Sequence, residues 1–162
     1  MALVELALGS TGKGLVHATY GLSEKIYPLL RAQLLGKVEV FSHNKSNKMK
    51  QYEAWRSYAG PAVFVASGFH EGIDLLGEQY AWQAITKVPF PSLEDPALRW
   101  LAEEEPLRYS WITARELLQA YGRICRGPAD TGTTYILDAA FKRFYTMNQE
   151  LFPSWFQEAG QI

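Results

Sequence analysis

The feature that most constrains the fold is an alternation of short β-rich runs with segments of helical period. Residues 61–67, "PAVFVAS", hold β-branched and aromatic side chains with no polar residue between them, which is typical of a strand buried on both faces. Residues 15–19 and 38–42 are further predicted strands, and residues 20–36 between them place leucines at helical spacing. Strands that alternate with crossover helices form a mostly parallel sheet, so the sequence predicts an α/β fold.

The rest of the chain continues this alternation. The further predicted elements are a helix over residues 48–60, a strand over 82–90, a short acidic helix over 98–106, a longer helix over 111–127, a strand over 133–139 and a last helix over 141–156, perturbed at Pro153. A length of 162 residues with 48% hydrophobic residues suits one domain with a sizeable core. Residues 15–162 are predicted to be this domain, and residues 1–14 a flexible lead-in or the boundary of an expressed fragment.

Charge and cysteine content exclude several classes of protein. A formal net charge of −1 provides no global field for nucleic acid, so any such site must be a local patch. The single cysteine, Cys125, excludes an internal disulfide framework, and we expect a cytoplasmic or nucleoid-associated location. The longest mainly apolar run, residues 58–69, is too short to span a bilayer, so no membrane partner is expected. The three histidines show no metal-ligand spacing, and no metal site is predicted.

Residues 7–16, "ALGSTGKGLV", come close to a phosphate-binding loop of the pattern G-x-x-x-x-G-K-[ST]. Around Gly12 and Lys13, the first glycine position is Ala7, and the metal-binding hydroxyl position is Gly14. A strand-like run also follows where a helix should begin. The sequence therefore predicts no nucleotide site in this stretch.

Ligands of parallel sheets bind beyond the carboxyl ends of the strands, so the segments that follow strands are the most informative. Residues 67–74, "SGFHEGID", directly follow the buried strand and contain a hydroxyl, two glycines, two carboxylates and an imidazole. Glycines allow a close approach of the backbone to a ligand, and the N–H groups of such a turn can meet anions. The same residues also fit an ordinary polar turn.

A second informative segment is residues 119–126, "QAYGRICR". Gln119, Arg123 and Arg126 are spaced by four and three residues, so they share one face of the predicted helix. Two stacked arginines repel each other unless an anion or carboxylates lie between them, and arginine can grip phosphate with two hydrogen bonds. Gly122 inside a helix costs about 1 kcal/mol, which indicates a close approach there. The alternative is a solvated face paired with neighbouring acids.

The loop over residues 42–50, "SHNKSNKMK", carries three positive charges and no acid. Lys45 and Lys48 could contact the phosphate backbone of a single strand, and Tyr20, after the first strand, could add a stacking surface. A solvated surface loop is the alternative.

The first two segments, in this order, resemble motifs V and VI of superfamily 2 helicases. The resemblance is closest to the XPD/DinG-like DNA helicases, whose motif V reads like "EGID" (residues 71–74) and whose motif VI reads Q-x-x-G-R-x-x-R (residues 119–126). It continues in "VPFPSLEDP" (residues 88–96) and "DTGTTYILDAAF" (residues 130–141), and "LVHATY" (residues 15–20) lies where motif IV would begin.

The resemblance implies a second RecA-like motor domain, a three-layer α/β/α sandwich with a mostly parallel central sheet. In this family ATP with Mg²⁺ lies in the cleft between two such domains. The implied partners are single-stranded DNA and the first motor domain of the same polypeptide. The chain contains no Walker A or D-E-x-H motif, so we expect it to be inactive alone, and a possible iron–sulfur cluster would lie outside it.

The resemblance also implies roles for single residues. Arg123 and Arg126 would be catalytic and face the γ-phosphate, one of them as an arginine finger. The other implied sites are nucleotide-binding residues Gly72, Asp74, Gln119 and Glu71, and DNA-binding residues Ser67, Tyr20, Lys45 and Lys48. Two alternatives stay open, namely a superfamily 2 translocase that acts on RNA, and a stand-alone α/β module that binds nucleic acid or nucleotide without motor activity.

Overall fold

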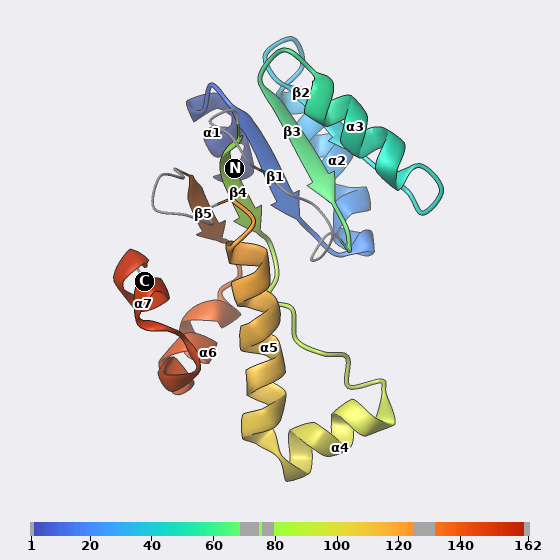
Figure 1. The fold of residues 1–162 in the computed structure, drawn as a ribbon. Helices are drawn as coiled ribbons and strands as arrows, with labels where there is room; N and C mark the ends of the chain where they lie inside the picture. The colour runs from blue at the N-terminus through green and yellow to red at the C-terminus, as the bar shows by residue number, and fades with distance from the viewer. Residues whose placement is uncertain (1, 69–74, 76–79, 125–131, 161–162) are drawn as a thin grey trace.

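The computed structural model describes residues 2–68, 75, 80–124 and 132–160. Within these residues, five parallel strands form one sheet in the order β2-β3-β1-β4-β5 (Figure 1). The strands are β1 (Lys13–His17), β2 (Glu39–Ser42), β3 (Ala62–Ala66), β4 (Tyr80–Ile85) and β5 (Thr133–Ile136). The α/β class with a parallel sheet is therefore confirmed.

Helices connect and cover these strands. They are α1 (Ala2–Gly9), α2 (Tyr20–Gln33), α3 (Lys48–Ser57), α4 (Pro96–Glu104), α5 (Pro106–Tyr121), α6 (Ala140–Met147), the 3₁₀ turn η1 (Gln149–Leu151) and α7 (Ser154–Ala159). Helix α4 and the first half of α5 extend away from the sheet, beyond the carboxyl ends of the strands (Figure 1). No helix in the described ranges has the length and apolar character needed to cross a membrane.

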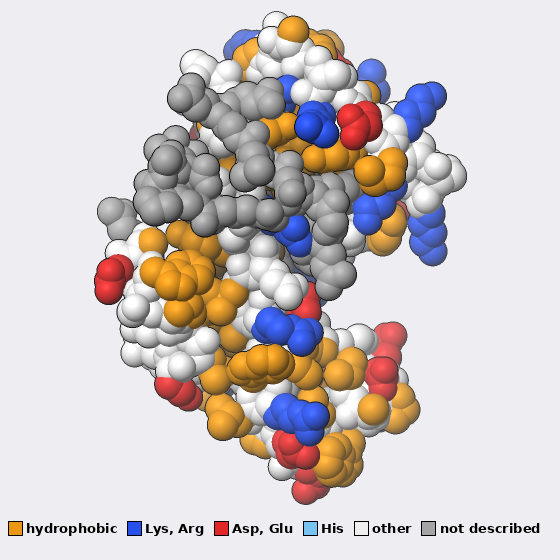
Figure 2. Space-filling view, in the orientation of Figure 1, with side chains coloured by type: hydrophobic (Ala, Val, Ile, Leu, Met, Phe, Trp, Pro, Cys, Tyr) orange, Lys and Arg blue, Asp and Glu red, His pale blue; other side chains and the backbone are white. Residues whose placement is uncertain are grey.

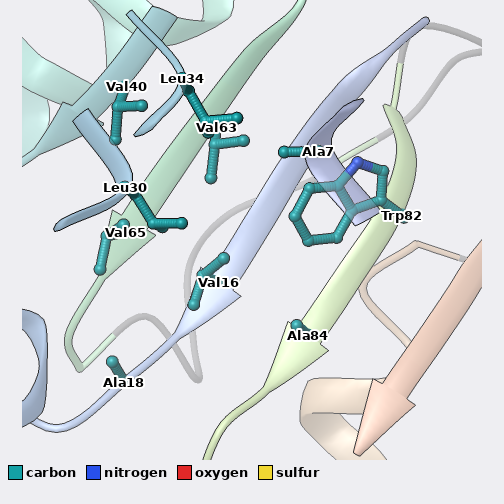
Figure 3. Packing of buried hydrophobic residues seen from close by; sticks show 10 residues of the cluster. All are labelled: Ala7, Val16, Ala18, Leu30, Leu34, Val40, Val63, Val65, Trp82 and Ala84. Carbon is teal, nitrogen blue, oxygen red and sulfur yellow. The ribbon is translucent and has the colours of Figure 1, made fainter. Parts of the chain in front are cut away.

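The central strands are buried on both faces because the two faces pack against different helices. Phe64 of β3 stacks on Trp55 of α3, with ring centroids 5.4 Å apart. Its neighbours Val63 and Val65 point to the opposite face and pack with Leu30 of α2 (Figure 3). A strand covered on both faces needs no polar residue in its sequence, which explains the unbroken apolar run at residues 62–66.

Residues 2–9 form a helix, whereas the sequence predicted a flexible lead-in for residues 1–14. Ala7 is 2% exposed and lies over β1 and β4, beside Val16 and the indole of Trp82 (Figure 3). Leu3, Val4 and Leu6 are partly buried in the same cluster. Helix α1 is apolar nearly all round, so its sequence shows no amphipathic period that would identify it as a helix.

Lys13, the lysine of the P-loop-like stretch, is the first residue of β1 and is 5% exposed. Its amine donates a hydrogen bond to the carbonyl of Arg56 and lies 5.9 Å from the ring centre of Tyr80. Burial lowers the pKa of the Lys13 amine. This lysine therefore belongs to a strand at the amino ends of the sheet, and not to a phosphate-binding loop.

The C-terminal segment also differs from its prediction. The sequence predicted one helix over 141–156 perturbed at Pro153, but α6 already ends at Met147. The side chain of Asn148 donates to the carbonyl of Phe144 at 2.8 Å and closes the helix. The chain then turns so that Phe152 and Phe156 can reach the cluster beneath α5.

We predict that Gly14→Ala destabilises the fold. A Cβ atom at Gly14 would overlap the six-membered ring of Trp82, which is 3% exposed and cannot move into solvent without opening the core. Overpacking of this kind costs about 1–3 kcal/mol. Urea unfolding measures the loss, with Gly21→Ala as the control because no atom lies within 4 Å of a Cβ there. Equal stability of Gly14→Ala and the parent would contradict the packing described.

Candidate functional site

The sheet has a switch point between β1 and β4. These strands lie side by side, but α2 leads from β1 toward β2 at one edge, while α4 and α5 lead from β4 toward β5 at the other. A crevice opens at such a point because the two connections diverge. The structure has a pocket of about 670 Å³ there, beyond the carboxyl ends of β1, β3 and β4.

The pocket brings together residues that lie far apart in the sequence. Its lining includes the buried residues His17 and Ser67, the half-buried Tyr109, and the exposed residues Tyr20, Lys87 and Phe90. Ser67 and Tyr20, both predicted DNA-binding residues, therefore line one pocket. Lys87, Phe90 and Tyr109 were not singled out from the sequence, although Phe90 lies in the segment "VPFPSLEDP" (residues 88–96) that carries part of the resemblance.

Ser67 directly follows β3 and lines the pocket, and a hydrogen bond fixes its backbone amide. Its amide donates to Nε2 of His43 at 3.0 Å, so Nδ1 of His43 carries the proton and donates to the carbonyl of Asn44 at 3.1 Å. The Ser67 side chain is buried, and its hydroxyl has no hydrogen-bond partner in the part of the chain that the structure describes. Gly68 follows with φ of 64°, a left-handed conformation that favours glycine.

The lysine loop lies beside this strand end. Lys48 donates from its amine to the carbonyl of Gly68 at 2.7 Å. The loop itself is ordered by Asn44, whose side-chain oxygen accepts from the amides of Ser46 at 2.9 Å and Asn47 at 3.1 Å. Lys45 is exposed and lines a second, smaller pocket that it shares with Tyr20. All four predicted DNA-binding residues thus lie along the carboxyl edge of the sheet.

Gln83, at the centre of β4, was not singled out from the sequence. It is completely buried, and its amide nitrogen donates to the carbonyls of Ala120 at 3.0 Å and Tyr121 at 2.9 Å, and to the hydroxyl of Thr134 at 2.8 Å. Its oxygen lies 3.1 Å from Nε2 of His17. Gln83 therefore fixes the end of α5 to the sheet. A lone glutamine within the apolar run "YAWQAI" was the available signal, since a buried amide requires partners.

The end of α5 corrects two predictions. The helix stops at Tyr121, so Gly122 is its C-cap residue and not an interior glycine, and Arg123 lies in the following turn. Gln119 and Arg123 therefore do not share one continuous helical face. Gln83 donates to the carbonyls of Ala120 and Tyr121, and the Ala120 carbonyl also accepts from the amide of Arg123 at 3.3 Å, so a tighter turn and a side chain close the helix end.

Gln119 is exposed on the last turn of α5, and Arg123 is half-buried. Glu71, Gly72, Asp74 and Arg126 lie outside the described residues. Among the side chains that the structure does describe, no three His, Cys, Asp or Glu residues lie close enough together to hold a metal ion.

Comparison with known proteins gives one family. The family model of the helicase C-terminal domain matches residues 3–159. No curated protein sequence matches the chain.

Solved structures show the same fold at low sequence identity. XPD in its apo form matches with a TM-score of 0.70 and 17% identity, over 92% of this chain and 33% of that one. S. tokodaii Xpd4 matches with a TM-score of 0.56 and 17% identity, over 90% and 31%. The C-terminal domain of the DEAD-box protein Dbp5 matches with a TM-score of 0.58 and 14% identity, over 98% and 78%. The fold is thus RecA-like, and the chain spans about a third of the length of the XPD structures.

We predict that Gln83→Leu loosens the end of α5. The substitution leaves two backbone carbonyls and the imidazole of His17 without the amide that pairs with them, at a cost of about 3 kcal/mol. Urea unfolding measures the loss, and Gln33→Leu at an exposed position of α2 is the matched control. If both variants unfold at the same urea concentration as the parent, Gln83 does not hold the site together.

Proposed function

The chain belongs to the helicase C-terminal domain family, and from this premise we propose that it is the second motor domain of an ATP-dependent DNA helicase of the XPD type. The observation that carries the proposal is the convergence of Ser67, Tyr20 and the lysine loop on the sheet edge where α5 is anchored. One edge of the sheet could thereby serve both a nucleotide and a nucleic-acid strand. Translocation would follow from closure and opening of a cleft shared with a first motor domain.

On the nucleotide side, we propose that Arg123 and Arg126 stabilise charge on the transferred phosphoryl group, with Gln119 orienting them. The support for this role is the fixed position of the backbone before Arg123. Gln83 holds the two carbonyls that precede Gly122, so the turn containing Arg123 starts from a fixed point. A preorganised cation is worth more than a mobile one because little reorganisation is needed when charge develops.

ATP and Mg²⁺ would be bound mainly by the first motor domain, and the motif match assigns Gly72, Asp74 and Glu71 to the facing side of the cleft. The isolated chain would then supply charge stabilisation without the groups that position the metal and the attacking water. We therefore expect this chain alone to hydrolyse no ATP above background.

On the other side of the same edge, we propose that a single strand crosses the carboxyl ends of β1 and β3. Lys45 and Lys48 would meet phosphates, while Tyr20 and Ser67 would face the strand. The "VPFPSLEDP" segment between β4 and α4 favours the DNA-acting XPD type over an RNA translocase.

We predict that Arg126→Ala and Arg123→Ala each abolish DNA-stimulated ATP hydrolysis in a longer protein that includes the proposed first motor domain. Loss of a charge-stabilising arginine costs about 10³-fold or more in phosphoryl transfer. Arg108→Ala on the exposed side of α5 is the control, since this arginine pairs only with Glu105 among the described residues. Hydrolysis at the parental rate in both arginine variants would contradict the catalytic role of these arginines. It would favour the alternative, a binding module without motor activity.

We predict that Lys45→Ala weakens binding of oligo-dT and lowers its dependence on salt. Each phosphate neutralised on a single strand contributes about 0.7 to the slope of log K against log salt concentration, so the slope should fall by that amount. Anisotropy titrations at several salt concentrations measure it. Lys37→Ala, at an exposed position near the amino ends of the strands, should leave the slope unchanged. An equal fall in both variants would show that the lysines act only through net charge.

A further inference from the structure

The segment between β4 and α4 forms a wall of the main pocket without being a helix or a strand. Hydrogen bonds join this segment to four other parts of the chain. The Thr86 hydroxyl donates to the His17 carbonyl at 2.7 Å, and the Val88 amide donates to the Asp138 carboxylate at 2.9 Å. The carbonyl of Pro91 accepts from the Tyr109 hydroxyl at 2.7 Å, and the carbonyl of Leu93 accepts from Nε of Arg99 at 2.9 Å. A segment tied at this many points needs little ordering when a ligand arrives.

Phe90 is the aromatic residue that this wall presents to solvent. Its side chain is 41% exposed and lines the pocket. One edge of the ring is supported by Phe144 of α6, with centroids 5.4 Å apart and planes at 90°. Pro89 and Pro91 on either side have fixed φ angles, so the backbone around Phe90 is stiff. A rigidly held and exposed aromatic ring is suited to stacking on a flat ligand.

Among the buried polar residues that line the pocket, Ser67 has a hydroxyl that is unsatisfied within the described residues. A buried hydroxyl of this kind requires a donor or an acceptor. A ligand that satisfies both features has an apolar face for Phe90 and a polar edge for Ser67, which describes a nucleobase.

Positive charge lies at the rim and not inside the pocket. Lys87 lines the pocket and is exposed, and the amine of Lys48 bonds to the carbonyl of Gly68, which also lines the pocket. In Figure 2 the part of the molecule that contains the sheet lies above, and the part that contains α4 and α5 lies below. A hollow opens between them, and lysine and arginine side chains of the upper part project beside it. This arrangement suits a strand whose phosphates stay at the rim while a base turns inward.

We propose that the pocket beyond β1 and β4 seats one unstacked base of single-stranded DNA, which stacks on Phe90 and bonds to the Ser67 hydroxyl. The proposal rests on the proposed function, and it adds a base-binding subsite to the backbone contacts.

The test uses the 162-residue chain and a fluorescein-labelled oligo-dT of about 12 nucleotides. We expect Phe90→Ala to weaken binding by about tenfold, since one base–aromatic stack is lost. Phe90→Leu, which keeps an apolar contact with Phe144, should weaken it similarly. The matched control is Tyr58→Ala, because Tyr58 is also 41% exposed and also lies edge-on to one phenylalanine, Phe41, but does not line the pocket.

A second oligonucleotide of equal length carries abasic sugars in place of the bases. For this ligand the parent and both Phe90 variants should bind with equal affinity, since only phosphate contacts remain. Parental affinity of the Phe90 variants for oligo-dT, an equal loss on the abasic strand, or no binding by the parent chain would each overturn the proposal. The first two outcomes would not contradict the proposed motor function, because that function is tested separately by ATP hydrolysis in the Arg123 and Arg126 variants.

Discussion

The buried amide of Gln83 is the interaction on which the rest of the site depends. It connects β4 with His17 on β1, with Thr134 on β5 and with the last carbonyls of α5. Inside a protein such bonds are strong because little water competes for them, and an unpaired group there is correspondingly costly. One side chain thereby contacts a residue that lines the pocket, a residue of the edge strand and the backbone that precedes the turn carrying Arg123.

The layered fold separates stability from function. The central strands bury one apolar face against α1 and α2 and the other against α3. The carboxyl ends of the strands are left for polar side chains and loops, and the divergence of connections at β1 and β4 opens a pocket between them. The proposed motor function would use such an edge, because nucleotide and strand would both contact it while the core stays closed.

Much of this could be predicted from the sequence, because strand runs, helical spacing and two short motifs are local patterns. The α/β class followed from residues 61–67 and their neighbours, and the family from residues 67–74 and 119–126. What was missed depends on contacts between distant segments. Helix α1 is defined by the sheet it covers, and the end of α5 by a glutamine about 40 residues earlier, so neither has a local signal. The place of Phe90 in a pocket likewise depends on residues from distant segments, so the sequence around Phe90 does not predict it.

We propose that the carboxyl edge of this sheet is a path for single-stranded DNA. Amide chemical-shift mapping of the isotope-labelled 162-residue chain, titrated with oligo-dT, tests it most directly because it reports on every part of the domain at once. The largest changes are expected at the amides of Tyr20, Ser67 and Phe90. Changes centred at the amino ends of the strands, around Lys13 and Lys37, would contradict it.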